Sequence, residues 1–182
     1  RPVFLLVPIA LLCVLAIGLA VTPNARAAAL IAAEDVPATA VTDFILADVT
    51  GDGSIHLVAV GDDSLVVLTP NEDFSWTELM SLPALPAPAT AVAVGDFIGD
   101  GEPAIAIGTA QAGAVYLLRW TGTDWTVVAQ TGYLWSPVAD LTAADLDGDG
   151  RPELVTVDAN GGITVFAWVN RALSPVWRWP TA

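Results

Sequence analysis

A short acidic motif occurs three times in the chain, and its residue types are suited to binding a metal ion. It reads Asp48-Val-Thr-Gly-Asp-Gly53, then Asp96-Phe-Ile-Gly-Asp-Gly101, then Asp145-Leu-Asp-Gly-Asp-Gly150. Aspartates at alternate positions bring carboxylates to one side of a tight loop, and the glycines permit the positive φ that such a loop needs. Because Ca²⁺ takes six to eight oxygen ligands, the motif predicts calcium loops.

The elements around the motif repeat with it. The motifs begin at residues 48, 96 and 145, a period close to that of one propeller blade of four strands. Short β-rich runs separated by Gly, Asn and Asp turns indicate strands and hairpins. The expected strands are 41–47, 55–60, 64–68 and 74–79, then 89–95, 104–107, 114–120 and 125–130, then 138–144, 154–157, 163–169 and 176–179. The sequence therefore predicts an all-β fold of three four-stranded, propeller-type blades, at about 41–86, 87–135 and 136–182.

Residues 38–180 resemble the FG-GAP/VCBS repeats, which also form the propellers of integrin α-subunits. In that family the loop between two strands supplies side-chain ligands at positions 1, 3, 5 and 9 and a backbone carbonyl at position 7. The resemblance implies Ca²⁺ as the bound ion and a propeller as the fold. Because propellers host many functions, it implies a function only by analogy.

The three loops match this ligand pattern to different extents. The third matches at every position, with Asp145, Asp147, Asp149, the Arg151 carbonyl and Glu153. The first offers Asp48, Thr50, Asp52 and the Ser54 carbonyl, but His56 stands at position 9. The second keeps Asp96 and Asp100, while Ile98 and Ala104 replace two ligands. The resemblance thus implies calcium foremost in the third loop, and the alternative for the second loop is a turn kept for its shape.

Other chemistry finds little support in the sequence. An EF-hand would need a bidentate acid at position 12 of the loop, where the third loop has Thr156. His56 is the only histidine, and no nucleophile, phosphate-binding or zinc motif accompanies it. We expect His56 to be a surface residue and the protein not to be an enzyme.

The N-terminal segment is apolar and predicts membrane attachment. Residues 2–21 contain no charged side chain, and about 20 helical residues span the roughly 30 Å hydrocarbon core of a bilayer. We interpret residues 1–22 as a transmembrane anchor or an uncleaved signal segment, and residues 23–40 as a linker. The alternative is a cleaved signal peptide, with Ala-Arg-Ala at 25–27 as the cleavage site. The expected location is a cell membrane, crossed once, with the repeats on the extracytoplasmic side.

The charge of the chain limits its partners. Six arginines and no lysine stand against 20 acidic residues, for a net charge of −14. This balance excludes non-specific nucleic-acid binding, which requires cationic side chains to neutralise phosphates. It favours an acidic surface that attracts cations.

The number of blades predicts a partner. Propellers usually close with four to eight blades, so we expect a protein partner or a second copy to complete an open arc of three. The leading hypothesis is a calcium-stabilised, membrane-anchored binding or scaffolding module, such as an accessory subunit of a membrane complex. The alternatives are a surface adhesin that binds glycans through its tryptophans, and a non-catalytic domain of a larger secreted enzyme. We expect most of the seven tryptophans to pack between blades.

Overall fold

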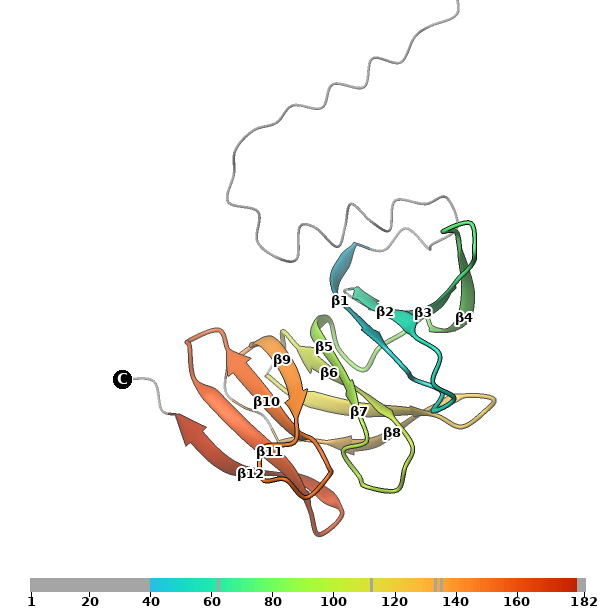
Figure 1. Cartoon of the computed structure of the whole chain (residues 1–182). Coiled ribbons are helices and arrows are strands. Elements are labelled where there is room, and N and C mark those ends of the chain that lie inside the picture. The colour runs from blue at the N-terminus through green and yellow to red at the C-terminus, as the bar shows by residue number, and fades with distance from the viewer. Residues whose placement is uncertain (1–39, 62, 112, 133, 135, 180–182) are drawn as a thin grey trace, which may run out of the picture.

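The computed structural model describes residues 40–179 except 62, 112, 133 and 135. Within them the protein is all-β, with three four-stranded antiparallel sheets and no helix (Figure 1). The predicted all-β fold and its three four-stranded sheets are therefore confirmed. The predicted N-terminal helix and linker fall on residues 1–40 and lie outside the described part, apart from residue 40. Among the described residues, none belongs to a helix of the length and hydropathy needed to cross a membrane.

Each sheet is built from strands that follow one another in the chain. Blade 1 contains β1 (Val41–Ala47), β2 (His56–Gly61), β3 (Leu65–Pro70) and β4 (Trp76–Leu82). Blade 2 contains β5 (Ala89–Gly95), β6 (Ala104–Thr109), β7 (Val115–Trp120) and β8 (Trp125–Gln130). Blade 3 contains β9 (Val138–Ala144), β10 (Glu153–Asp158), β11 (Ile163–Val169) and β12 (Ala172–Trp179). In every blade the strands pair in chain order, and the acidic motif lies in the loop between the first and second strands.

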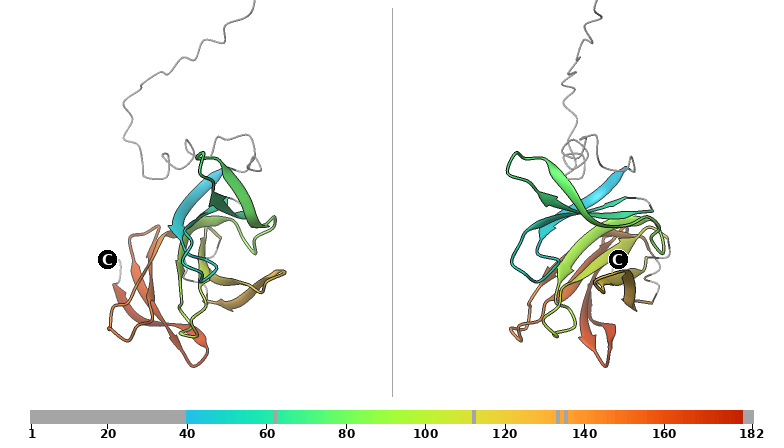
Figure 2. Two further views of the ribbon diagram at one scale, coloured as in Figure 1. Left: turned by 45° about the vertical axis from the view of Figure 1, so that its right-hand side comes forward. Right: turned by 90° about the vertical axis from the view of Figure 1, so that its right-hand side faces the viewer.

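The blades are arranged like neighbouring blades of a propeller, with their first strands on the inside (Figure 2). β5 lies against β1 on one side and against β9 on the other. We call the side of a blade that packs on the next blade its front face, and the opposite side its back face. Because side chains alternate along a strand, each blade offers one set of residues to each neighbour.

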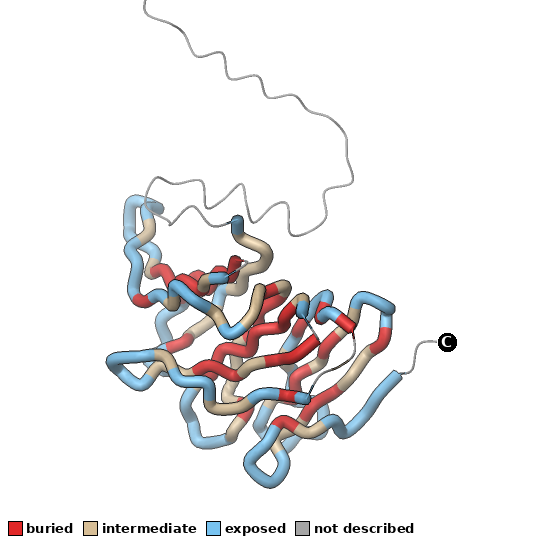
Figure 3. The backbone as a smooth tube through the Cα atoms, turned by 180° about the vertical axis from the view of Figure 1, so that it is seen from behind, coloured by how far each residue is buried: buried red, intermediate tan, exposed pale blue. Residues whose placement is uncertain are grey.

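The core consists mainly of two layers between blades, seen as the red segments in Figure 3. One layer joins the front face of blade 1, including Val58 and Val67, to the back face of blade 2, including Ile105. The other joins the front face of blade 2, including Ala106, to the back face of blade 3, including Phe166. A third, smaller cluster of buried residues lies on the back face of blade 1. Burial of apolar surface between sheets is thus the main stabilising contribution, at about 25 cal/mol per Å².

The exposed fraction of the second residue in each acidic motif depends on whether another blade packs on that side. Val49 is 9% exposed and packs in the layer between blades 1 and 2. Phe97 is 1% exposed and packs between blades 2 and 3. Leu146 occupies the same position in blade 3 and is 58% exposed. The front face of blade 3 therefore lacks the cover that the other two front faces have.

A partly buried carboxylate links the inner strands of blades 1 and 2. Asp43 on β1 accepts hydrogen bonds from the backbone N–H of Val92 on β5, at 2.9 Å, and from its neighbour Phe44, at 2.8 Å. Burial raises the pKa of Asp43, and the two N–H groups oppose that rise. Asp140 holds the corresponding place on β9 and accepts the N–H of Leu141 at 2.8 Å, but it is exposed.

The tryptophans divide into packed and exposed groups. Trp120 and Trp125 meet edge to face, with ring centroids 5.4 Å apart, and pack against the layer between blades 1 and 2. Trp168 packs against the layer between blades 2 and 3. Trp177 and Trp179 on β12 are 49% and 62% exposed. The expected packing between blades thus holds for three of the six described tryptophans. Trp76 packs against the cluster on the back face of blade 1, and the exposed pair belongs to the outer strand of blade 3.

Replacing Phe97 tests the contribution of the layer between blades 2 and 3. Phe97→Ala leaves a cavity in a fully buried layer, so we expect a loss of about 3–5 kcal/mol in the free energy of unfolding. Leu146→Ala is the matched control at the same loop position, and because its side chain is exposed we expect a change within about 0.5 kcal/mol. Urea unfolding of both variants measures the difference. Equal losses would show that the front face of blade 3 is covered in solution.

Candidate metal centre

The three acidic motifs form loops of one shape, which we call loop 1 (residues 48–56), loop 2 (96–104) and loop 3 (145–153). In each, the aspartate at position 1 accepts hydrogen bonds from the backbone N–H groups of the glycines at positions 4 and 6. The N···O distances are 2.7 and 2.7 Å in loop 1, 2.7 and 2.8 Å in loop 2, and 2.7 and 2.9 Å in loop 3. The first aspartate therefore organises the loop backbone, whatever the other positions contain.

Glycine is required at positions 4 and 6 because the backbone there is left-handed. The φ angles are +75° and +87° in loop 1, +79° and +88° in loop 2, and +80° and +88° in loop 3. Side chains with a Cβ rarely adopt this region, whereas glycine does so freely. The glycines predicted to shape the loops are thus confirmed in that role.

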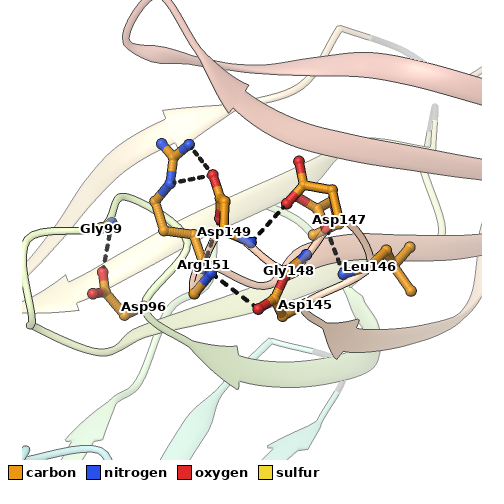
Figure 4. A network of polar contacts seen from close by, with 10 residues as sticks. Asp96, Gly99, Asp145, Leu146, Asp147, Gly148, Asp149 and Arg151 are labelled. Carbon is orange, nitrogen blue, oxygen red and sulfur yellow. Dashed lines mark hydrogen bonds and ion pairs between the residues drawn. The ribbon is translucent and has the colours of Figure 1, made fainter.

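Loop 3 brings its aspartates together as the sequence predicts. One carboxylate oxygen from each of Asp145, Asp147 and Asp149 lies within 4.8 Å of the others, and all three residues are exposed (Figure 4). Asp147 accepts the backbone N–H of Asp149 at 3.0 Å, which holds its side chain over the loop. Three convergent carboxylates on one side of a loop are the hard oxygen ligands that Ca²⁺ prefers, so this loop fits the ion.

The remaining predicted ligands of loop 3 are placed differently. Glu153 is 7% exposed, and its Oε2 accepts the backbone N–H of Leu146 at 2.8 Å. Its second carboxylate oxygen forms no hydrogen bond among the described residues. The Arg151 guanidinium binds the Asp149 carboxylate and thereby lowers the pKa of Asp149. Asp149 thus already forms an ion pair with an arginine of its own loop.

Loop 1 contains fewer carboxylates and a buried imidazole. Thr50 donates its hydroxyl to Asp48 at 3.3 Å, and Asp52 accepts the backbone N–H of Ser54 at 2.8 Å. The expectation that His56 lies on the surface is wrong, because His56 is only 4% exposed at the start of β2. Position 9 is buried in all three loops, since Ala104 and Glu153 are 1% and 7% exposed. The Nδ1 of His56 has no hydrogen-bond partner among the described residues.

Loop 2 has a cationic partner that the motif does not contain. The guanidinium of Arg119 on β7 pairs with both oxygens of Asp100, at 2.7 and 3.0 Å, and also donates to the carbonyl of Glu102 at 3.0 Å. This pairing lowers the pKa of Asp100. Asp96 is occupied by the glycine N–H groups of its own loop. The sequence prediction missed Arg119, and its one signal is that arginines are few in this chain.

A comparison with protein-family models identifies the repeat. Residues 96–156 match the FG-GAP-like repeat. The FG-GAP-like stretch begins at the first aspartate of loop 2, runs through β6 to β9, and ends in β10 after loop 3. The resemblance noted from the sequence is therefore confirmed over this stretch, and blade 1 repeats its loop geometry. No curated protein matches the chain.

An open cavity of about 590 Å³ lies beside loop 3. Its lining combines loop residues such as Leu146 and Asp147 with front-face residues such as Val165 and Trp177. The candidate metal loop and the exposed front face of blade 3 therefore form one continuous surface, acidic at the loop and apolar on the sheet.

The position-1 aspartates should stabilise the fold even without metal. We expect Asp145→Ala, measured in chelator, to lower Tm by a few degrees, because two glycine N–H groups in tight turns lose their acceptor. Asp63→Ala is the control, since that exposed aspartate makes no side-chain hydrogen bond among the described residues. Thermal unfolding followed by circular dichroism measures both. Identical Tm values for the two variants would contradict the organising role.

Proposed function

We propose that this chain is a calcium-stabilised, non-catalytic protein-binding module, which acts on the outer side of a membrane as an accessory or scaffolding subunit. The single observation that supports binding is the front face of blade 3. The corresponding faces of blades 1 and 2 are each covered by the next blade, whereas this face remains open.

The open face is apolar and has the same layout as the covered ones. Val155 and Val165 align with Ala106 and Leu117 of blade 2, by the pairing of their strands. Trp177 pairs with Val165 and extends the face outward. Trp177 and the exposed Leu146, Val169 and Val176 form a patch of the kind that marks interaction sites on soluble surfaces, whereas Val165 is itself buried.

Charge favours a different protein as the occupant over a second copy. Two chains that each carry a net charge of −14 repel one another. At the junction of blades 2 and 3, Arg151 lies against Gly99 of loop 2, so closely that a Cβ on Gly99 would overlap its side chain (Figure 4). If a partner packs on blade 3 as blade 3 packs on blade 2, it presents an apolar sheet face to the blade. A basic residue at the edge of that face would then lie against loop 3.

Two further features support the proposed setting. The three convergent carboxylates of loop 3 provide ligands for calcium, which is abundant outside cells. The uncharged run at residues 2–21 has the length of a membrane anchor. A module fixed at one end and open at the other face is suited to holding a second protein at a membrane surface.

Calcium should stabilise the folded chain through loop 3. We expect Tm of the full chain to rise with calcium concentration, because an ion that binds only the native state stabilises it by about 2.7 kcal/mol at 100 times its Kd. Asp147→Ala should abolish this rise, whereas Thr50→Ala at the same position of loop 1 should retain it. Thermal unfolding in calcium and in chelator measures the effect. An unchanged calcium response in Asp147→Ala would remove loop 3 from the proposal.

The open face should contact the partner in the native setting. A photo-crosslinking amino acid at Trp177 is expected to form one discrete protein adduct on the membrane-attached full chain. The control is Phe74, which is 93% exposed on the β3–β4 turn, away from the proposed surface, and should form none. Mass spectrometry of the adducts measures both. Equal labelling at the two positions would contradict the proposed surface, and an adduct with glycan instead of protein would favour the adhesin hypothesis.

A further inference from the structure

Arg119 contacts the two groups of loop 2 that a metal ion would use. Its Nη1 lies 2.7 Å from Asp100 Oδ2, and its Nη2 lies 3.0 Å from Asp100 Oδ1. The same Nη2 donates to the Glu102 carbonyl at 3.0 Å. Asp100 is position 5 of the loop and Glu102 is position 7, so the planar guanidinium spans one side-chain and one backbone ligand position at once.

From this geometry we propose that the Arg119 guanidinium takes the place of the metal ion in loop 2, so that blade 2 is closed by an internal cation and does not depend on calcium. The inference concerns blade 2 alone. It does not require the partner or the calcium dependence proposed for the whole module.

The ligand set of loop 2 does not fit calcium but does fit a single positive charge. Ile98 and Ala104 supply no oxygen at positions 3 and 9, and Ala104 is only 1% exposed. Loop 3 has four acids at the side-chain positions, whereas loop 2 has two. Of these, Asp96 accepts the glycine N–H groups, and Asp100 is the carboxylate that the Arg119 guanidinium contacts. One guanidinium satisfies that carboxylate through two parallel, charge-assisted hydrogen bonds.

The arginine occurs only in the blade whose loop lost its ligands. Leu118 pairs with Ile105 on β6, as Leu68 pairs with Leu57 and Phe166 pairs with Leu154 in the other blades. The residues that follow these are Arg119 in blade 2, Thr69 in blade 1 and Ala167 in blade 3. Neither Thr69 nor Ala167 carries a charge, so the other two loops receive no cation from this position.

The ion pair between Arg119 and Asp100 is partly buried. The Arg119 side chain is 20% exposed and that of Asp100 is 45% exposed. The Nε of Arg119 is buried without a hydrogen-bond partner among the described residues, while both Nη atoms donate to the loop. Blade 2 is the blade that packs against both others, and an internal cation keeps its loop closed in all calcium concentrations.

The first test removes the guanidinium in the absence of calcium. We expect Arg119→Gln, in the full chain and in chelator, to lower Tm by about 2–4 °C, which is a modest loss suited to a partly exposed pair. Arg178→Gln is the control, because it removes an equal charge from the exposed strand β12 and should leave Tm unchanged. An Arg119→Gln variant with the Tm of the control would overturn the proposal.

The second test counts bound calcium ions by isothermal titration with calcium chloride alone. Asp100→Asn should leave the number of ions unchanged, and the loss of one ion would overturn the proposal. Ile98→Asp with Ala104→Asp restores the missing ligands, and we expect it to bind an additional ion only when Arg119→Gln is also present. An additional ion with Arg119 still in place would likewise overturn the proposal. If Ala104→Asp prevents folding, the number of ions bound by the Asp100→Asn variant decides alone.

Discussion

Each blade of this protein is a sheet with two apolar faces, and both faces must be removed from water for the sheet to be stable. Blade 2 meets this requirement entirely within the described residues, since its back face lies on blade 1 and its front face on blade 3. Blade 3 does not, and its Leu146 is exposed where Phe97 and Val49 are buried. The radial arrangement, the two core layers and the open face all follow from this one constraint.

The three loops share one backbone shape but differ in the charged groups that contact their carboxylates. Position 1 and the two glycines set the shape through backbone hydrogen bonds to the first aspartate. What varies is the charge that balances the remaining carboxylates: Arg119 reaches Asp100 from another strand, and Arg151 reaches Asp149 from within its own loop. Loop 3 retains carboxylates in excess of its arginine, and this excess supports the calcium ion that we propose there.

Much of the fold was predictable because its signals are local. Alternating apolar residues and the glycine-rich turns predicted the strands to within a few residues, and the recurrence of the motif predicted the number of blades. The errors involve contacts that depend on strand register. The burial of His56 at the start of β2 is not evident from the motif, which places this residue in the loop. Arg119 reaches loop 2 only because Leu118 pairs with Ile105, and no motif at the loop itself encodes this pairing.

The metal loop and the open face are coupled through the second residue of the motif. In blades 1 and 2 this residue joins the loop to the neighbouring blade, so the position of the loop and the packing of the next sheet depend on one another. Leu146 extends from loop 3 in the same way, and the N–H of Leu146 is bound by Glu153, itself a predicted calcium ligand. An ion held by Asp145, Asp147 and Asp149 would therefore fix the part of the surface that a partner meets first. The proposed calcium ion and the proposed partner would then share one site at blade 3, and each would strengthen the binding of the other, since both would restrict the same loop.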